Sequence, residues 1–238
     1  MHGFANPTRF LNIARPLTPW FLVLGLATIA FALGAGLFYT PPDYLQGDSV
    51  RIMYVHVPTI WLGMAGWAGI LVAGVMQLVW KHPLAGIAGR AIAVPGAMFT
   101  ALGLITGSIW GRPTWGTWWV WDGRLTSALV LFFLYLGYIA LASASEEQGG
   151  TSKMAAIFGI VGAINLPIIH YSVTWWNSIH QVQSITLQGS TIDMAILWPM
   201  LVSMAGFTLL FAAIVLMRMR TIIAGVRIEA RLRRMAEG

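Results

Sequence analysis

The chain has 238 residues, of which 58% are hydrophobic and only 9% are charged, and its mean hydropathy is +0.74. These values exclude a soluble domain and a disordered tail, and they are typical of a polytopic membrane protein. The net charge of +6 and the pI of about 10.2 reflect the basic loops of such a protein, so we expect no nucleic-acid binding.

Six apolar runs follow one another along the chain. A helix needs roughly 20 residues to cross about 30 Å of hydrocarbon, and each run is close to that length. The runs are apolar on all sides, whereas the strands of a membrane β-barrel alternate. We therefore predict an all-α polytopic membrane protein in which residues 1–238 form a single domain. Its six spans are expected at residues 20–39, 54–80, 91–109, 125–144, 154–171 and 194–217.

Basic residues predict the orientation of these spans. With six spans both termini lie on one side, and that side carries eleven of the fourteen lysines and arginines. The opposite side carries only Arg51, Arg112 and Arg124. Because basic loops stay in the cytoplasm, we expect both termini to be cytoplasmic. The basic tail from Arg218 onward is expected to contact anionic lipid, with an acidic partner as the alternative.

The outward segment between the third and fourth spans, residues 110–124, contains five of the 12 tryptophans. It begins W-G-R-P-T-W-G-T-W-W-V-W-D. Tryptophan favours the membrane–water interface, because its ring is apolar while its indole N–H needs a polar partner. A short helix here would place Trp115, Trp118, Trp119 and Asp122 on one face, although two glycines and a proline favour an interrupted start.

This tryptophan cluster has two interpretations. Single tryptophans at a span end usually form an aromatic belt that anchors the neighbouring helices at the interface. Five of them within 13 residues make a broad aromatic surface instead, which suits a large, flat, mostly apolar ligand with polar edges. We favour the ligand platform.

Three histidines lie at outer span ends or in outward loops. His56 stands in Y-V-H-V-P, His170 near the end of the fifth span, and His180 in W-W-N-S-I-H-Q. Imidazole is the usual ligand of haem iron, and two imidazoles from different segments can hold it on both axial sides. The ordinary alternative for each is a neutral histidine bonded to a backbone carbonyl. Zinc is a weaker interpretation, because there is no cysteine and no H-E-x-x-H motif.

The outward arginines are candidates for the edge of such a ligand. A guanidinium binds a carboxylate through two parallel hydrogen bonds, so Arg51, Arg112 and Arg124 are suited to the propionates of a porphyrin. Each could equally snorkel to the interface. Since a chain without cysteine cannot attach haem through C-x-x-C-H, the expected cofactor is haem b, bound non-covalently.

Together these motifs resemble those of the CcmC family, haem-handling membrane proteins of cytochrome c maturation. The resemblance covers nearly the whole chain. The run W-G-T-W-W-V-W-D is similar to the WWD signature of that family. The segments Y-V-H-V-P before this run and W-W-N-S-I-H-Q after it match the family's two flanking histidine segments. The resemblance implies that His56 and His180 are axial ligands of haem iron, whereas His170 matches no family ligand. The implied platform residues are Trp115, Trp118, Trp119, Trp121 and Asp122.

The resemblance also implies a location and partners. Proteins of this family lie in the bacterial inner membrane, hold haem on the periplasmic face and present it to the haem chaperone CcmE. Their other partners are the small membrane protein CcmD and the ATP-binding-cassette pair CcmA and CcmB. The chain lacks the G-x-x-x-x-G-K-[ST] motif, so we expect it not to be an enzyme and ATP to be hydrolysed by a partner.

Two other functions remain as alternatives. A b-type cytochrome subunit for electron transfer would usually carry histidine pairs on facing spans inside the bilayer, whereas His56 and His180 fall at or outside the outer boundary. A permease subunit of a haem exporter would carry polar residues through the midplane of the bilayer. The spans contain few of these, chiefly Gln77 and Asn165.

Overall fold

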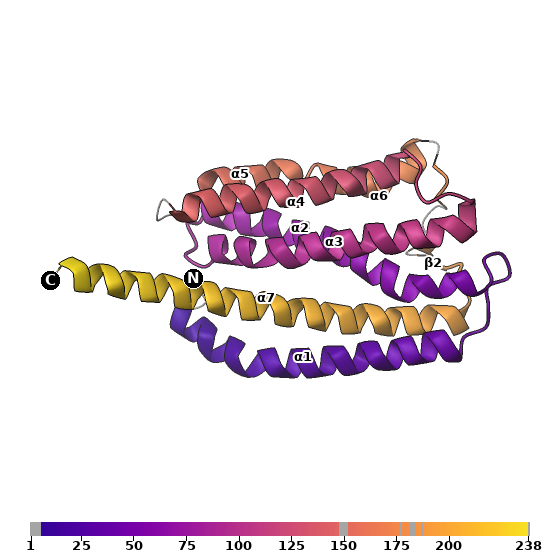
Figure 1. The fold of residues 1–238 in the computed structure, drawn as a ribbon, viewed down its shortest axis with the longest axis horizontal. Helices are drawn as coiled ribbons and strands as arrows, with labels where there is room; N and C mark the ends of the chain where they lie inside the picture. Colours follow the sequence, from indigo (N-terminus) through magenta and orange to yellow (C-terminus); the bar gives the residue numbers. More distant parts are fainter. Residues whose placement is uncertain (1–5, 148–151, 177, 181–183, 187, 238) are drawn as a thin grey trace.

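The computed structural model describes residues 6–147, 152–176, 178–180, 184–186 and 188–237, and it is a bundle of long helices that lie side by side (Figure 1). Within these residues, six helical segments are long and apolar enough to cross a membrane. The predicted all-α, six-span fold is thus confirmed. The helices are α1 Pro7–Phe38, α2 Met53–Leu78, α3 Ala85–Trp115, α4 Gly123–Glu147, α5 Lys153–Gly162, α6 Asn165–Trp175 and α7 Met194–Glu237.

The fifth span consists of two helices rather than one. α5 ends at Gly162, and α6 starts at Asn165 after a turn. Pro167 lies in the first turn of α6, where its missing N–H removes no helical hydrogen bond. The side chain of Asn165 donates to the carbonyl of Ser127 on α4, at 2.9 Å. The break between α5 and α6 therefore falls between Gly162 and Pro167. The apolar run from which the span was predicted does not indicate this break.

The short helix that would place Trp115, Trp118, Trp119 and Asp122 on one face does not form. Instead α3 continues past Pro113 to Trp115 and ends where Gly116 adopts a left-handed conformation with φ of 78°. The guanidinium of Arg112 donates to the carbonyl of Gly116. A glycine in this conformation is a common helix terminator, so residues 116–122 follow without helical structure and carry the remaining tryptophans.

The bundle is built from helix pairs that approach closely. α1 packs mainly against α7, and α2 packs mainly against α3. A Cβ atom on Gly206 of α7 would lie 2.9 Å from the backbone nitrogen of Ile29 on α1. Small residues of this kind let membrane helices pack backbone to backbone. The closely packed helices fix the positions at which the loops begin and end.

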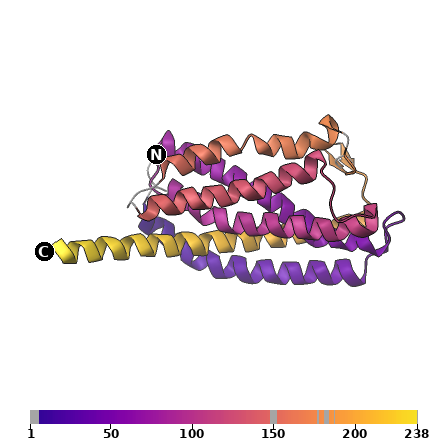
Figure 2. The same ribbon diagram turned by 45° about the horizontal axis from the view of Figure 1, so that its top comes forward.

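The two ends of the bundle differ. Both chain termini lie at one end (Figures 1 and 2), which we call the terminal end. The other, the loop end, carries the start of α2, the segment 116–122 and a short hairpin of β1, Ile185–Thr186, and β2, Gly189–Ser190. A 3-10 helix, η1 Asp48–Ile52, leads into α2 there. The loop end therefore gathers the outward segments that the sequence singled out.

Candidate functional site

His56 lies in the first turn of α2 and is held against α3. Its Nδ1 atom is 3.0 Å from the carbonyl oxygen of Gly103 and 3.3 Å from the hydroxyl of Thr106. A carbonyl only accepts, so Nδ1 carries the proton and donates it, which leaves the Nε2 lone pair available. Gly107 makes room for the ring, since a Cβ there would lie 2.8 Å from Cε1 of His56. Trp110 packs edge-on against it.

The segment 116–122 folds back over the end of α3. The hydroxyl of Ser108 donates to the carbonyl of Trp118 at 2.8 Å, which ties the segment to the helix. The rings of Trp118 and Trp121 are 57% and 74% exposed. Trp119 packs against Trp121 with ring centroids 5.5 Å apart, and its indole N–H is buried without an acceptor among the described residues. The segment therefore offers open aromatic faces together with one buried donor that has no partner.

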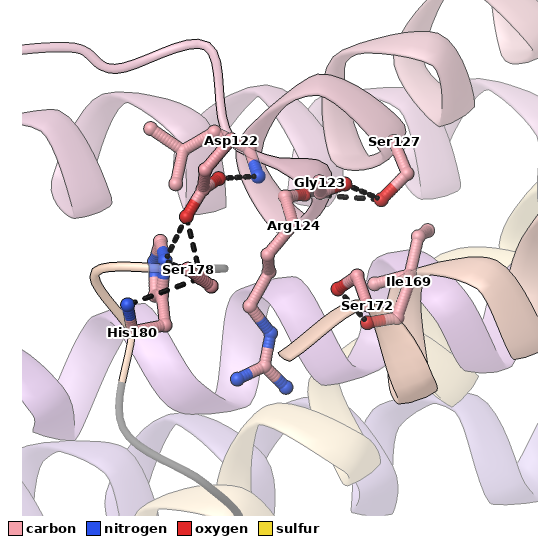
Figure 3. Close-up of polar contacts among 9 residues, drawn as sticks. Asp122, Gly123, Arg124, Ser127, Ile169, Ser172, Ser178 and His180 are labelled. Atoms are coloured by element: carbon pink, nitrogen blue, oxygen red, sulfur yellow. Dashed lines mark hydrogen bonds and ion pairs between the residues drawn. The ribbon is translucent and has the colours of Figure 1, made fainter. Parts of the chain in front are cut away.

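Asp122, at the end of this segment, joins it to His180. One carboxylate oxygen of Asp122 lies 2.9 Å from Nδ1 of His180 and accepts from the hydroxyl of Ser178 at 2.6 Å (Figure 3). The other accepts from the backbone N–H of Leu125 at 2.8 Å. The ring of Trp115 packs edge-on against His180, with centroids 4.6 Å apart. The carboxylate thus fixes the orientation of the imidazole.

The protonation states follow from these contacts. Burial lowers the pKa of the His180 imidazole, and this effect outweighs the opposing one of Asp122. Burial would raise the pKa of the Asp122 carboxyl, but the hydrogen bonds from Ser178, Leu125 and His180 hold it below its usual range. At neutral pH a neutral imidazole therefore donates Nδ1–H to a carboxylate. This leaves Nε2 of His180 as a bare ligand atom, the arrangement typical of metal-binding histidines.

The three outward arginines have different surroundings. Arg51 donates to the carbonyls of Leu37 and Thr40 at the end of α1 and pairs with Asp48 at 3.1 Å. Arg112 closes the end of α3, as described above. The side chain of Arg124 makes no hydrogen bond or ion pair with the described residues, and it extends away from Asp122 (Figure 3). Among the three, its guanidinium alone binds none of the described residues, so all of its N–H groups remain for a ligand.

The structure brings together several of the residues that the sequence singled out. His56 and His180 both lie near enough to Arg124 for its positive charge to disfavour a proton on either imidazole, and Trp115 and Asp122 both contact His180. His170 points elsewhere: it is exposed on α6, with its ring against Tyr171.

Sequence reasoning missed two residues of this site. Ser178 supports Asp122, and Gly107 makes space for His56. A lone serine in a loop and a glycine in an apolar helix carry no distinguishing signal, because their roles depend on partners 56 and 51 residues away in sequence. Only the fold places these partners beside them.

Known proteins resemble this chain along almost its whole length. The model of the family CcmC, heme exporter protein C, matches residues 1–234. Heme exporter protein C of Bradyrhizobium diazoefficiens is 47% identical over 230 residues, which cover 95% of this chain and 86% of that protein. The protein of the same name from Escherichia coli strain K12 is 44% identical, with 94% and 90% covered. That of Paracoccus denitrificans is 39% identical, with 97% and 96% covered.

Proposed function

The chain belongs to the heme exporter protein C family, and from this premise and the geometry of the loop end we propose that it binds haem at the periplasmic surface of the inner membrane and transfers it to the haem chaperone CcmE. In this proposal haem b is a non-covalent cargo. The protein is not an enzyme, and its loop end faces the periplasm.

The contact between Asp122 and His180 carries this proposal. It joins the tryptophan-rich segment to a histidine from a distant loop, at 2.9 Å. A carboxylate that accepts Nδ1–H fixes the tautomer and makes Nε2 a better metal ligand. His56 has the same tautomer, because its Nδ1 donates to a carbonyl. Two such imidazoles from separate segments suit the two axial positions of haem iron.

The surroundings of the two histidines suit the rest of a porphyrin. The exposed rings of Trp118 and Trp121 offer apolar surface for its faces. The indole N–H of Trp119 is a buried donor without a partner among the described residues, and the Arg124 guanidinium binds none of them (Figure 3); both suit propionate oxygens. Arg51 and Arg112 are less suited, because each already binds backbone carbonyls. The site is open at the loop end, so haem is held by contacts that a docking partner can replace.

The partners in this proposal follow from the family. CcmE receives haem at the loop end, CcmD lies beside the chain in the membrane, and the pair CcmA and CcmB supplies ATP hydrolysis, for which this chain has no P-loop. The permease and electron-transfer alternatives gain no support from the spans. Gln77 and Asn165 each donate to a backbone carbonyl, so neither is left to line a polar path within the described residues.

A paired substitution tests the platform. Replacing Trp118 and Trp119 with Ala removes one exposed face and one unpaired donor, while α3 and α4 keep their ends. We expect less haem on the purified protein and less haem loaded onto CcmE, with unchanged membrane insertion. The matched control replaces Trp20 and Trp80, which are exposed elsewhere on the bundle, and should leave both quantities unchanged. If the variant that lacks Trp118 and Trp119 loaded as much haem onto CcmE as the unmodified chain, the tryptophans would serve only as an aromatic belt at the membrane interface.

A thiol-labelling experiment tests the orientation. Because the chain has no cysteine, single cysteines can be introduced without background. Tyr44→Cys at the loop end should react with a membrane-impermeant reagent in cells whose outer membrane alone is permeable. Ala236→Cys at the terminal end should react only after the inner membrane is opened. The reverse pattern would place both histidines in the cytoplasm and contradict transfer to a periplasmic chaperone.

A further inference from the structure

The C-terminal part of α7 projects beyond the rest of the bundle. α7 spans 44 residues as one uninterrupted helix, about 66 Å at 1.5 Å per residue, whereas roughly 20 residues cross a membrane. Figures 1 and 2 both show its end standing past the terminal end of every other helix. Nothing in the proposed haem site uses this extension.

Two arginines bind α7 to the bundle at the base of its projecting part. Nε of Arg218 donates to the carbonyl of Ala91 on α3, at 3.1 Å, and a guanidinium nitrogen of Arg227 donates to the hydroxyl of Thr8 on α1, at 3.1 Å. From residue 226 to residue 237 every residue is exposed. The projecting helix is therefore held at its base, and no hydrogen bond or ion pair joins residues 228–237 to another element of the described chain.

The distal turns carry two stripes. Ile228, Leu232 and Met235 follow a spacing of four and three residues, so they share one face of the helix, and they are 57%, 59% and 79% exposed. Arg231 and Arg234 repeat the same spacing from Arg227 along an adjoining face. An exposed apolar stripe beside a basic one is typical of a helix that binds in an apolar groove with an acidic rim.

We propose that this apolar and basic surface, residues 228–235 of α7, is a docking site for a cytoplasmic protein with an acidic-rimmed apolar groove. Charge complementarity selects an acidic partner, and distance selects a protein rather than lipid headgroups. Because α7 continues along its membrane-crossing axis, Leu232 lies about 20 Å beyond Arg218. The attraction of anionic lipid is screened over about 8 Å at physiological ionic strength. The cytoplasmic location of this surface rests on the orientation in the proposed function.

Photo-crosslinking in intact cells tests this inference on the full chain. A benzophenone amino acid at Leu232 should form an adduct with one protein, whereas the same group at Ala230, two residues away and so on the opposite face, should not. Arg231→Glu should lower the adduct yield about tenfold, as expected for an interfacial charge pair. The matched variant Arg233→Glu makes the same charge change on the other side and should leave the yield unchanged.

Charge exchange completes the test. Replacing the acidic residue nearest the adduct on the captured protein with Lys should restore the yield with Arg231→Glu. Equal adducts from Leu232 and Ala230, no adduct from Leu232, or a charge exchange that restores nothing would each overturn the inference. The haem spectrum of Arg231→Glu should match that of the unmodified chain, so failure here is distinguishable from failure of the proposed haem site.

A second measurement separates the lipid outcome. Leu232→Cys, labelled with an environment-sensitive fluorophore, is reconstituted in vesicles of phosphatidylcholine alone and of equal parts phosphatidylcholine and phosphatidylglycerol. We expect the same emission in both. A blue shift in the anionic vesicles that Arg231→Glu removes would assign this surface to lipid and overturn the protein docking site.

Discussion

The two candidate iron ligands are held in contrasting ways. His56 belongs to a helix, and its Nδ1 donates to the backbone of the neighbouring helix at 3.0 Å. His180 belongs to a loop, and its Nδ1 donates to the side chain of Asp122, 58 residues away in sequence, at 2.9 Å. One side of the site therefore depends on helix packing and the other on a single carboxylate. In the proposed function, release of haem therefore begins on the His180 side without any helix movement.

Asp122→Asn tests the carboxylate side and should have the largest effect among the variants that keep both histidines. An amide oxygen is a weaker acceptor than a carboxylate, so it holds the tautomer of His180 less firmly and makes Nε2 a weaker iron ligand. We expect haem affinity to fall about 10–100-fold, measured by absorption titration. Asp193→Asn, a carboxylate that accepts from the backbone N–H of Ala195 at 2.7 Å, is the control. Equal affinity in the two variants would contradict the role of Asp122.

Arg124→Gln tests the edge of the site. Loss of a charge-assisted bond to a propionate should lower haem affinity about tenfold while the axial-ligand spectrum stays unchanged. Arg112→Gln should have little effect on affinity, because that guanidinium binds the carbonyl of Gly116. A larger effect at Arg112 than at Arg124 would show that the propionates lie on the other side of the segment.

Gly107→Ala tests how firmly the packing of α2 against α3 holds His56. The added Cβ would lie 2.8 Å from Cε1 of His56, so the ring must shift. We expect a loss of about 1 kcal/mol in binding, or roughly fivefold in affinity. Gly34→Ala is matched, since a Cβ there meets nothing within 4 Å. Equal affinities in the two variants would show that His56 has more freedom than its contacts with α3 indicate.

Of the predicted effects on haem binding, a change of pH near neutrality should be the smallest. Iron binds the neutral imidazole, and burial lowers the pKa of His180 below the usual value of about 6.5. His180 therefore takes up a proton at lower pH than a free imidazole does, and the loss of binding on acidification should be centred below pH 6.5. A haem-retention series over pH checks this expectation. Half-release at pH 6.5 or above would mean that burial does not protect His180.

The helical architecture could be predicted from sequence because apolar length and charge asymmetry are local properties. The six spans follow from runs of about 20 apolar residues. The ends of the helices could not be predicted in the same way. α3 extends into the tryptophan-rich run because Gly116, rather than Pro113, ends it. α7 continues far past residue 217, because basic residues are compatible with a helix in water.

The candidate site was predictable where chemistry alone identifies a residue. Histidine and clustered tryptophan are rare enough to stand out, so three outward histidines and the tryptophan-rich run could be singled out before any fold was known. The resemblance to the CcmC family then favoured His56 and His180 over His170. The bond from Asp122 to His180 could not be predicted, because it depends on how the loop after α6 returns to the start of α4. For the same reason, sequence alone could not distinguish Arg124 from Arg51.

The absorption spectrum of the purified protein, from cells well supplied with haem, shows whether His56 and His180 bind haem iron. We predict a bis-imidazole haem spectrum that changes or disappears in both His56→Ala and His180→Ala. The variant His82→Ala, at the terminal end, should retain it. A wild-type protein without haem, or an unaltered bis-imidazole spectrum in His180→Ala, would contradict the assignment of these two histidines as the axial ligands.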